Sequence, residues 1–579
     1  MNHRSDIKRW RVGFITGCIL LMWLILAVRL VQVQGYSRDG FASRATRQRT
    51  FKETIPARPG EIVDRNGHVL ALTVTRRSLF LDPSRIENRW EVAQGLASAL
   101  NLNADRLYQQ LSEKASRRFI WVKRRLSDGE VQRVRELNLP EETWGYRNEY
   151  QRSYPQGNLA AHALGIRNID NEGSGGVEQS FDSAIRGTEG SRILVRDARG
   201  AVIDIRPDEA PRHGATIVTT IDSTLQVQVE KQLDEIVERW APTGACAIVM
   251  QPATGDILAM ASRPSFNPNE PAGQKDAWSN LCISAVYEPG STIKPFIVGW
   301  AIDQGLLNAN EIFDCENGAY RMGRRVLHDS HPYGRLSVND VLVKSSNIGM
   351  AKIGERLTNE GLYRSLLTFG FVRRTGLELP GELSGLVRSL DKWNDYSIGS
   401  VPMGHEIAIT PMQLITAHAA LANGGRMVYP RLTTAESSPL PTPVDTISRD
   451  SAPAPIVAQT ISPEIAHWLV TGPMREVVER GTAKRARIEG VSVFGKTGTA
   501  QKLTPDGPVG HVCSFVGGAP AENPGVLVLV VVDCPTGQGV HYGGTVAAPA
   551  AREILLGSLQ KVAAMTRMTS KTQLRGSAQ

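Results

Sequence analysis

The sequence has few cysteines and lacks the motifs that bind metals or nucleic acids. Only six cysteines occur among 579 residues, and no two of them form a C-x-x-C pair, which argues against a metal cluster. A chain of this length can bury a core without cross-links, so we expect no obligatory disulfide and mostly buried thiols. Zinc-finger spacing, an RNP-like aromatic motif and internal repeats are also missing, and we predict no metal, no cofactor and no nucleic-acid partner.

Basic residues are in modest excess over acidic residues. The chain has 66 Lys and Arg against 58 Asp and Glu, a net charge of +8 at pH 7. A basic surface suits anionic lipid or anionic wall polymer as well as it suits nucleic acid. Hydrophobic residues make up 41% of the chain, which is typical of globular proteins, and the length predicts two to four folded units.

Only one long apolar run is present, close to the N-terminus. Residues 12–28 carry no charged side chain and would rise about 25 Å as a helix, close to the ~30 Å hydrocarbon core of a bilayer. We predict a transmembrane anchor over residues 12–30 and a cytoplasmic tail over residues 1–11, because basic residues cluster before the run. These are Arg4, Lys8, Arg9 and Arg11. A cleaved signal peptide is the alternative, but the run is long for one and no small-x-small cleavage site follows it.

The region after the anchor, residues 36–218, is predicted to be a mixed α and β domain. Asn66-Gly67 lies between two apolar runs, which is a strong hairpin signal. Residues 90–140 show helical periodicity. A glycine-rich stretch and a charged strand-like segment complete this region.

A second domain is predicted over residues 219–557. It begins with an amphipathic helix, for which Asp222 is the expected N-cap, and continues with two strands. Residues 437–455 are rich in Ser, Pro and Thr and are expected to form a surface loop. Residues 558–579 are polar and basic, and we expect a disordered tail.

The first short motif that could carry chemistry is Ser-x-x-Lys at Ser291 and Lys294, which lie one helical turn apart. We call it the first string. Pro289-Gly290 ends the preceding segment, and a helix is expected from Thr292. A serine hydroxyl is a weak nucleophile that needs a base within hydrogen-bond reach. A lysine can be that base only where burial or a neighbouring cation lowers its pKa from about 10.4. The pattern also arises by chance, since Ser5, Ser389 and Ser558 begin the same string.

The second string places Ser345 two residues before Asn347, between an apolar segment and an amphipathic helix. The serine could relay a proton to the leaving group, and Asn347 could hold Lys294 and a substrate amide. The alternative is an ordinary N-cap serine followed by a helix. Ser-x-Asn also recurs at Ser265 and Ser337.

The third string follows an alternating apolar strand and reads Lys496-Thr497-Gly498-Thr499. Gly498 lets the backbone approach a ligand closely, and an edge strand here could bind an extended peptide. The lysine and the two hydroxyls suit a terminal carboxylate. The alternative is a basic turn at a strand end. Lys-Thr-Gly occurs once in the chain, and the order of the three strings is the one found in penicillin-binding proteins and class A β-lactamases.

With these three strings, the sequence resembles the class B penicillin-binding proteins from the anchor to about residue 557. The motifs that carry the resemblance are PARPGEIVDRNG, AHALGIRN, GGVEQSFD, TIDSTLQ, YEPGSTIKP, KSSN, ITPMQL, KTGTAQK and HYGGTVAAP. The resemblance implies an α+β multi-domain protein. A single transmembrane helix and a mixed pedestal or dimerisation-like domain would precede a transpeptidase domain of the serine D,D-peptidase and β-lactamase type, with an antiparallel sheet flanked by helices.

The resemblance also implies a reaction. Ser291 would attack the penultimate D-alanine carbonyl of a stem peptide and release D-alanine, with Lys294 as the base. Ser345 and Asn347 would complete the proton network. An amine from a second stem peptide would then resolve the acyl-enzyme and form the cross-link, while β-lactams would remain trapped on Ser291.

Substrate binding is implied for the third string. Lys496, Thr497 and Thr499 would bind the carboxylate of the donor peptide or of a β-lactam, with Gly498 between them. The backbone amides of Ser291 and Thr499 would form the oxyanion hole, where removing one donor typically costs about 3–4 kcal/mol.

Within class B, the sequence is most similar to the cell-division (septal) subgroup, through RDARGAVI, HYGGTVAAP and a short N-terminal tail. The implied partners are D-Ala-D-Ala stem peptides, β-lactams, a polytopic glycosyltransferase and other division proteins. The protein would be single-pass in the cytoplasmic membrane, with its catalytic domain on the periplasmic side. No extension resembles a glycosyltransferase domain, so a monofunctional enzyme is expected.

Two stretches depart from the common pattern of the family. Arg58-Pro59-Gly60 has a proline where Arg-Gly or Arg-Arg-Gly is usual, and SIGSVPMGHEIAITPMQL replaces an FGYGL-type stretch. We interpret its His405 as structural. The alternatives for function are a β-lactamase or D,D-carboxypeptidase, an elongation-type transpeptidase, and a non-enzymatic β-lactam sensor.

Overall fold

The computed structural model describes residues 9–36, 43, 49–197, 202–271, 275–434, 456–504 and 507–561. The chain divides into two compact units. The first unit consists of Met1–Arg58 and Gly187–Gly214, and the second consists of Pro59–Arg186 and Ala215–Gln579. Three predictions lie outside the described residues: most of the cytoplasmic tail, the surface loop over residues 437–455, and the C-terminal tail from residue 562 onward.

The first unit begins with the apolar helix α1, Arg9–Val31, followed by the π-helical turn η1, Gln32–Tyr36. The predicted anchor over residues 12–30 lies entirely within α1. By length and composition, Trp10–Gln34 is long and apolar enough to cross a membrane. Its large apolar side chains are exposed, as expected for a helix whose partner is lipid.

The first unit also contains a three-stranded antiparallel sheet in the order β1-β8-β9. The strands are β1, Thr50–Ile55, β8, Gly190–Arg196, and β9, Val202–Glu209. Leu194 in the central strand pairs with Phe51 on one side and Ile205 on the other, so these apolar residues share one face.

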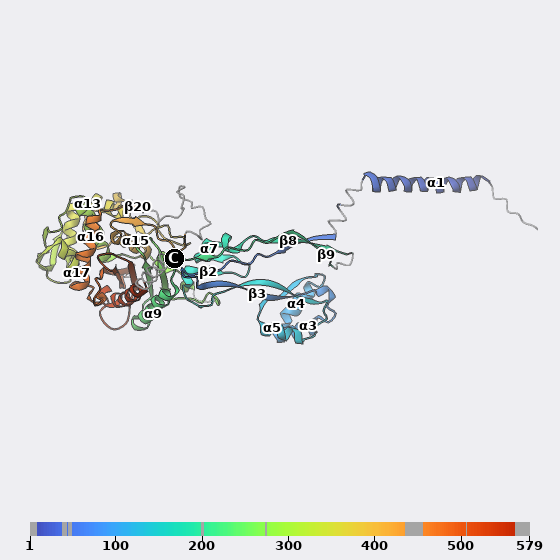
Figure 1. The fold of residues 1–579 in the computed structure, drawn as a ribbon, viewed down its shortest axis with the longest axis horizontal. Coiled ribbons are helices and arrows are strands. Elements are labelled where there is room, and N and C mark those ends of the chain that lie inside the picture. The colour runs from blue at the N-terminus through green and yellow to red at the C-terminus, as the bar shows by residue number, and fades with distance from the viewer. Residues whose placement is uncertain are drawn as a thin grey trace, which may run out of the picture. The chain divides into compact units, whose positions relative to one another are not determined.

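The second unit begins with a five-stranded sheet built around the long strand β3 (Figure 1). Its path is β10-β2-β3-β4, and β5 also pairs with β3. The strands are β2, Ile62–Val63, β3, Val69–Leu81, β4, Ile120–Leu126, β5, Trp144–Ser153, and β10, Ile217–Val218. The predicted hairpin turn is confirmed, because Gly67 has φ +85° and its amide donates to the Asp64 carbonyl at 3.1 Å.

Three helices pack at one end of β3, as Figure 1 shows: α3, Arg89–Leu100, α4, Ala104–Glu113, and α5, Asp128–Glu136. The helical periodicity predicted over residues 90–140 is therefore confirmed in part, but β4 interrupts it. Ile120 and Leu126 are buried at the two ends of β4, and residues between them are half-buried, so a strand satisfies this apolar pattern as well as a helix does.

The part of the second unit that follows β10 is built on a five-stranded antiparallel sheet in the order β12-β11-β23-β22-β21. The strands are β11, Gly244–Met250, β12, Ile257–Arg263, β21, Phe494–Thr504, β22, Gly507–Ala519, and β23, Val526–Asp533. This is the antiparallel sheet implied by the family resemblance. The strand β21, which carries the third string, lies at one edge.

Helices cover both faces of this sheet. Along β11, Ile248 and Met250 join one core, while Ala247 and Val249 join the other. The first core contains residues of α11, Lys294–Asp303, α13, Asn347–Thr368, α15, Pro411–Ala422, and α16, Pro463–Thr471. The second core contains residues of α9, Ser223–Trp240, α17, Pro473–Glu479, and the helix over residues 548–561. Asp222 caps α9 as predicted, accepting from the Leu225 amide at 3.0 Å.

Short elements connect these layers. The helical ones include α6, Ala161–Leu164, α7, Gly176–Ser180, α8, Asp182–Arg186, α10, Leu281–Ser284, η4, Gly290–Ile293, α12, Val338–Lys344, α14, Ser397–Ser400, η7, Val401–Met403, and α18, Gly543–Val546. The strands are β6, Ile166–Arg167, β7, Gly173–Ser174, β13, Ile312–Asp314, β14, Ala319–Met322, β15, Arg325–His328, β16, Arg335–Ser337, β17, Leu386–Val387, β18, Ile407–Ala408, β19, Arg426–Val428, and β20, Ile456–Gln459.

The prediction of a disordered tail from residue 558 is wrong for its first four residues. Residues 558–561 are helical, and Ser558 is buried and donates to the Ile554 carbonyl at 2.7 Å. Of the polar side chains in this last helical turn, Gln560 is exposed, whereas Ser558 faces the core. The five cysteines after α1 are buried thiols, as predicted.

Candidate active site

Ser291 lies in η4, a 3-10 turn that continues directly into α11. Pro295 is in the first turn of α11, where a proline is tolerated. The preceding Gly290 has φ +54°, and its amide donates to the Gly404 carbonyl at 3.2 Å. A Cβ on Gly404 would lie 2.1 Å from the Gly290 carbonyl oxygen, so these two glycines let the serine turn pack against the loop after η7.

Lys294 is fully buried beneath this turn, and its ammonium group is held by the second string. Its Nζ donates to the Ser345 carbonyl at 2.7 Å and to Asn347 Oδ1 at 2.9 Å. Burial lowers the pKa of Lys294 to about 7, although the Asp329 carboxylate opposes this shift. Near neutral pH a substantial fraction of the amine is therefore unprotonated, as a general base requires.

Ser345 lies between two buried lysines. It ends α12 in the left-handed conformation, with φ 60° and ψ 39°. Its Oγ accepts from Lys496 Nζ at 2.9 Å and lies 3.3 Å from Lys294 Nζ. Burial, together with the nearby charge of Lys294, holds the pKa of Lys496 well below its ordinary value. The hydroxyl can therefore exchange protons with either amine.

The N-cap of α13 is Ser346, not Ser345. The Ser346 hydroxyl accepts from the Gly349 amide at 2.9 Å and donates to Asp329 Oδ2 at 2.6 Å. The N-cap interpretation of the second string therefore applies to Ser346. The hydroxyl of Ser345 does not cap the helix and remains available to the two lysines. Asn347 begins α13, and its Nδ2 donates to the His328 carbonyl at 3.2 Å.

The third string lies on β21, alongside the serine turn. A Cβ on Gly498 would lie 2.8 Å from the Pro289 carbonyl oxygen, so only a glycine allows this approach. Thr499 Oγ1 accepts from the Gly543 amide at 3.0 Å, which leaves its own hydrogen free to donate to a ligand. Among the described residues, β22 is the only strand paired with β21, so the other edge is open to an extended peptide.

Two residues that support the site were not found by sequence reasoning. Asp329 accepts from the amide of Ile348 at 3.1 Å and also from that of Asn347, and so fixes the start of α13. Thr482 Oγ1 lies 2.7 Å from Thr497 Oγ1. Neither residue belongs to a string with recognisable spacing, and only the tertiary fold brings them to the site.

A cavity of about 350 Å³ adjoins these residues. It is lined by Tyr287 and Glu288, just before the serine turn, and by Ala500, Gln501 and Lys502, which follow Thr499 on β21. Cavities of this size bind small ligands or part of a peptide. It therefore offers room for a ligand beside β21, next to the serine turn.

His405 borders this site through a hydrogen bond to Glu288. Its Nδ1 lies 2.7 Å from Glu288 Oε2, and the Glu406 amide donates to Glu288 Oε1 at 2.9 Å. The histidine thus helps to fix the segment that leads into the serine turn, in keeping with its interpretation as a structural residue.

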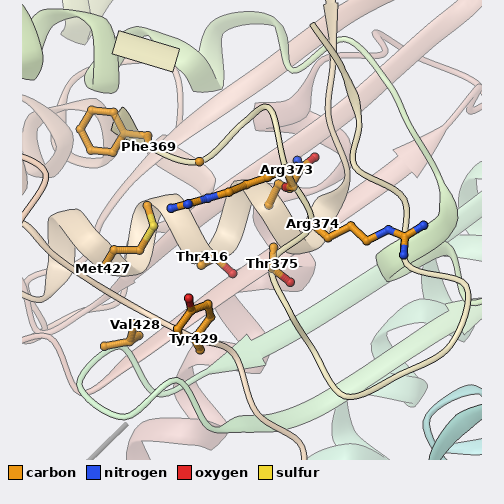
Figure 2. Close-up of a pocket in the computed structure, with 10 residues that line it drawn as sticks. Phe369, Arg373, Arg374, Thr375, Thr416, Met427, Val428 and Tyr429 are labelled. Atoms are coloured by element: carbon orange, nitrogen blue, oxygen red, sulfur yellow. Dashed lines mark hydrogen bonds between the residues drawn. The ribbon is translucent and has the colours of Figure 1, made fainter. Parts of the chain in front are cut away.

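A second cavity, shown in Figure 2, contains none of the predicted site residues. Phe369, Arg373, Thr416, Met427 and Tyr429 contribute to its wall. Its volume of about 30 Å³ is sufficient for little more than a water molecule. Within the described part of the chain, no group of three or more His, Cys, Asp or Glu side chains could hold a metal ion.

Two family descriptions match the chain. Residues 245–556 match "Penicillin binding protein transpeptidase domain", and residues 54–219 match "Penicillin-binding Protein dimerisation domain". The chain is 31% identical to the probable peptidoglycan D,D-transpeptidase PenA of Neisseria meningitidis, over 95% of this chain and 92% of PenA. It is also 31% identical to the peptidoglycan D,D-transpeptidase FtsI of Escherichia coli, over 96% of this chain and 92% of FtsI.

Solved structures show the same fold. Penicillin-binding protein 3 of Mycobacterium tuberculosis, complexed with aztreonam, is 26% identical and has a TM-score of 0.66, covering 88% of this chain and 97% of that chain. A peptidoglycan synthetase from Bifidobacterium adolescentis has a TM-score of 0.69 at 24% identity, covering 89% of this chain and 97% of that one.

Proposed function

This chain belongs to the class B penicillin-binding proteins, and from that membership we propose how its residues carry out peptidoglycan D,D-transpeptidation. It is a serine-type D-Ala-D-Ala transpeptidase that binds stem peptides and β-lactams. Ser291 is the nucleophile, and the pairing of two buried lysines through the Ser345 hydroxyl is the observation that supports this assignment most directly.

In the acylation step, unprotonated Lys294 removes the proton of Ser291 as Oγ attacks the penultimate D-alanine carbonyl. The amides of Ser291 and Thr499 stabilise the developing oxyanion. The C–N bond to the terminal D-alanine then breaks. Ser345 passes a proton to the leaving nitrogen, and D-alanine departs as the free amine.

In the second step, the amine of an acceptor peptide attacks the ester carbonyl on Ser291. The new amide bond forms as the ester C–O bond breaks, the amine loses a proton to the lysine and serine network, and Ser291 recovers its own. Asn347 orients Lys294 through both steps, because its Oδ1 accepts from the lysine Nζ.

The carboxylate of the donor is bound by Lys496, Thr497 and Thr499. Two properties support this role. The Lys496 amine is buried where a carboxylate would be partly desolvated, and a bound carboxylate would favour its charged form. The hydrogen of the Thr499 hydroxyl is free to donate, because its oxygen accepts from the Gly543 amide. Gly498 lets the strand approach the serine turn. A β-lactam presents an equivalent carboxylate and acyl carbonyl.

The assignment is tested by labelling with a fluorescent penicillin. Ser291→Ala should lose all covalent label while its circular dichroism spectrum and thermal unfolding remain those of the wild type. Ser389→Ala, in another copy of the same string, is the matched control and should label normally. Full labelling of Ser291→Ala would exclude Ser291 as the nucleophile.

We further propose that the enzyme acts in septal wall synthesis, together with a polytopic glycosyltransferase and other division proteins. The similarity to FtsI supports this role. The catalytic domain would lie on the periplasmic side of the cytoplasmic membrane, with a pedestal over residues 36–218 and a transpeptidase domain over residues 219–557. Depletion should produce filamentous cells with incomplete septa; rounded cells with normal septa would favour the elongation role instead.

A further inference from the structure

A basic β-hairpin borders the active site and has no part in the chemistry described above. It consists of residues 319–328, with β14 and β15 joined by a tight turn in which Gly323 has φ +60°. Arg321 pairs with Val326, and Arg324 occupies the turn. We call this element the basic hairpin.

The two faces of the basic hairpin differ. Tyr320, Met322 and Leu327 lie on the inner face and join a small apolar core. Because side chains alternate along a strand, Arg321 and Val326 lie on the outer face. Both arginines are exposed.

The hairpin is fixed to the catalytic residues at its base. The carbonyl of His328, the last residue of β15, accepts from Asn347 Nδ2 at 3.2 Å. The next residue is Asp329, which fixes the start of α13. The base of the basic hairpin therefore lies one side chain away from Lys294, because Asn347 contacts both.

The hairpin is also fixed near its tip. Arg325 Nη1 donates to Ser400 Oγ at 2.7 Å, and Met322 packs so closely on Gly399 that a Cβ there would lie 2.6 Å from its sulfur. Gly404 lies four residues after Ser400, and its carbonyl accepts from the Gly290 amide in the serine turn. The basic hairpin thus spans two segments that each contact a catalytic group, and it lies along the rim of the site.

The positive charge of the hairpin is not neutralised by its surroundings. Glu316 pairs with Lys352 at 2.7 Å, and Glu355 accepts from the Tyr320 hydroxyl at 2.9 Å. The carboxylate of Asp329 is used at the start of α13. Within the described residues, neither Arg321 nor Arg324 has an ion pair or a side-chain hydrogen bond. Two exposed guanidinium groups at the rim of a site are suited to carboxylates.

The position of the hairpin indicates which substrate it meets. On the proposed function, the acyl part of the donor would extend along β21 into the cavity lined by Glu288 and Ala500. The terminal D-alanine would then lie on the other side of the nucleophile, near Lys496 and Ser345, where its carboxylate is bound. An acceptor that takes the place of this D-alanine would bring its own chain past Asn347, whose side chain contacts the base of the basic hairpin.

We propose that Arg321 and Arg324 bind carboxylates of the incoming acceptor peptide and so select an acidic acceptor. This inference rests on the proposed transpeptidase function and deepens it. The arginines act after acylation, when the acceptor amine approaches the ester. They contribute to recognition of the acceptor and leave formation of the acyl-enzyme unaffected.

The experiment separates the two steps. Acylation is measured with a fluorescent penicillin, and transfer is measured with a small N-acyl-D-alanyl thioester as donor. The acceptors are an amine-bearing tripeptide with two free carboxylates and its diamide. The variants are Arg321→Gln/Arg324→Gln and, as a control of equal charge change, Arg373→Gln/Arg374→Gln, two exposed arginines beside the cavity of Figure 2.

We expect the wild type and the control to prefer the free acid over the diamide by roughly fivefold, and the preference to fall with salt. The hairpin variant should lose the preference and acylate normally, which also shows that it is folded. A retained preference in the hairpin variant, an equal loss in the control, or no preference in the wild type would overturn the proposal. A wild type that takes up no penicillin would instead contradict the proposed function itself.

Discussion

At the scale of single residues, the proposed chemistry depends most on the hydroxyl of Ser345. Among the residues that the structure describes, it is the one group with hydrogen bonds to both buried lysines. The left-handed backbone at Ser345 turns this hydroxyl toward the lysines, while the next residue, Ser346, begins α13. Two adjacent serines therefore have separate roles, one in proton transfer and one in holding a helix end.

These roles predict opposite results for two matched variants. Ser345→Ala should reduce the second-order rate constant of penicillin acylation by about 10²-fold or more, with little change in thermal unfolding. Ser346→Ala removes an N-cap and should lower the free energy of unfolding by about 1 kcal/mol, with a smaller effect on acylation. Equal acylation losses in the two variants would contradict this division of roles.

The pKa of Lys294 predicts the pH dependence of acylation. An amine is a base only when it is neutral, and burial lowers the pKa of Lys294 to about 7. The acylation rate constant should therefore rise about tenfold per pH unit below pH 7 and level off above about pH 8. Stopped-flow fluorescence with a labelled penicillin measures this profile. A rise that continues to about pH 10 would mean that the lysine keeps its ordinary pKa.

At the scale of elements, the serine turn is held by the loop after η7. The closest approach is at Gly404, which has φ +84° and no room for a Cβ because the Gly290 carbonyl lies against it. Tyr287 and Ile409 exchange two backbone hydrogen bonds of 3.1 and 2.9 Å beside it. The position of the nucleophile is therefore set by a segment more than a hundred residues later in the chain.

Gly404→Ala should displace the serine turn and reduce acylation by roughly tenfold or more, because the added methyl would meet the Gly290 carbonyl. Gly305→Ala is the matched control, since Gly305 also has a positive φ, of +70°, but has nothing within 4 Å of the added Cβ. Both variants should lose about 1–2 kcal/mol of stability from backbone strain. Only Gly404→Ala should label slowly with penicillin.

A buried ion-pair cluster joins β5, β6 and α7 in the second unit. Glu178 accepts from Arg152 Nε at 2.6 Å and from Arg167 Nε at 2.9 Å, and all three side chains are buried. Removing one partner of such a cluster leaves a buried charge without compensation. The cluster therefore holds three short elements together only while it is complete.

Glu178→Ala should lower the free energy of unfolding by about 3–5 kcal/mol. Glu360→Ala, which breaks an exposed pair with Arg364 on α13, should cost no more than about 0.5 kcal/mol. Denaturant unfolding of the two variants measures both values. A loss at Glu178 as small as the loss at Glu360 would show that the cluster contributes little.

At the scale of the whole molecule, the sequence predicted the architecture and the three strings, because each has a local signal. The apolar run, the turn at Asn66-Gly67 and the cap at Asp222 depend on neighbouring residues only. Asp329 reaches the start of α13 only through the tertiary fold, and the edge position of β21 depends on strand order; no local pattern encodes either. The strand β4 lies within a region that was predicted to be helical. Its half-buried residues fit the apolar repeat of a helix as well as that of a strand.

The fold brings the strings together by packing α11 against α13 and the serine turn η4 against the edge strand β21. In this arrangement the Ser345 hydroxyl lies within hydrogen-bond distance of Lys294 and Lys496, although long segments separate the three residues in the chain. The roles proposed for the residues of the three strings share one consequence: a penicillin should acylate Ser291 and remain bound to it.

The most direct test is the mass of the intact protein and of its peptides over hours after one addition of penicillin. We predict a single adduct of the full antibiotic mass on the peptide that contains Ser291, persisting for hours, as expected of a penicillin-binding protein that deacylates slowly. An adduct that disappears while hydrolysed penicillin accumulates would indicate a β-lactamase. An adduct on any other residue, or none on a folded protein, would contradict the central claim that Ser291 is the nucleophile.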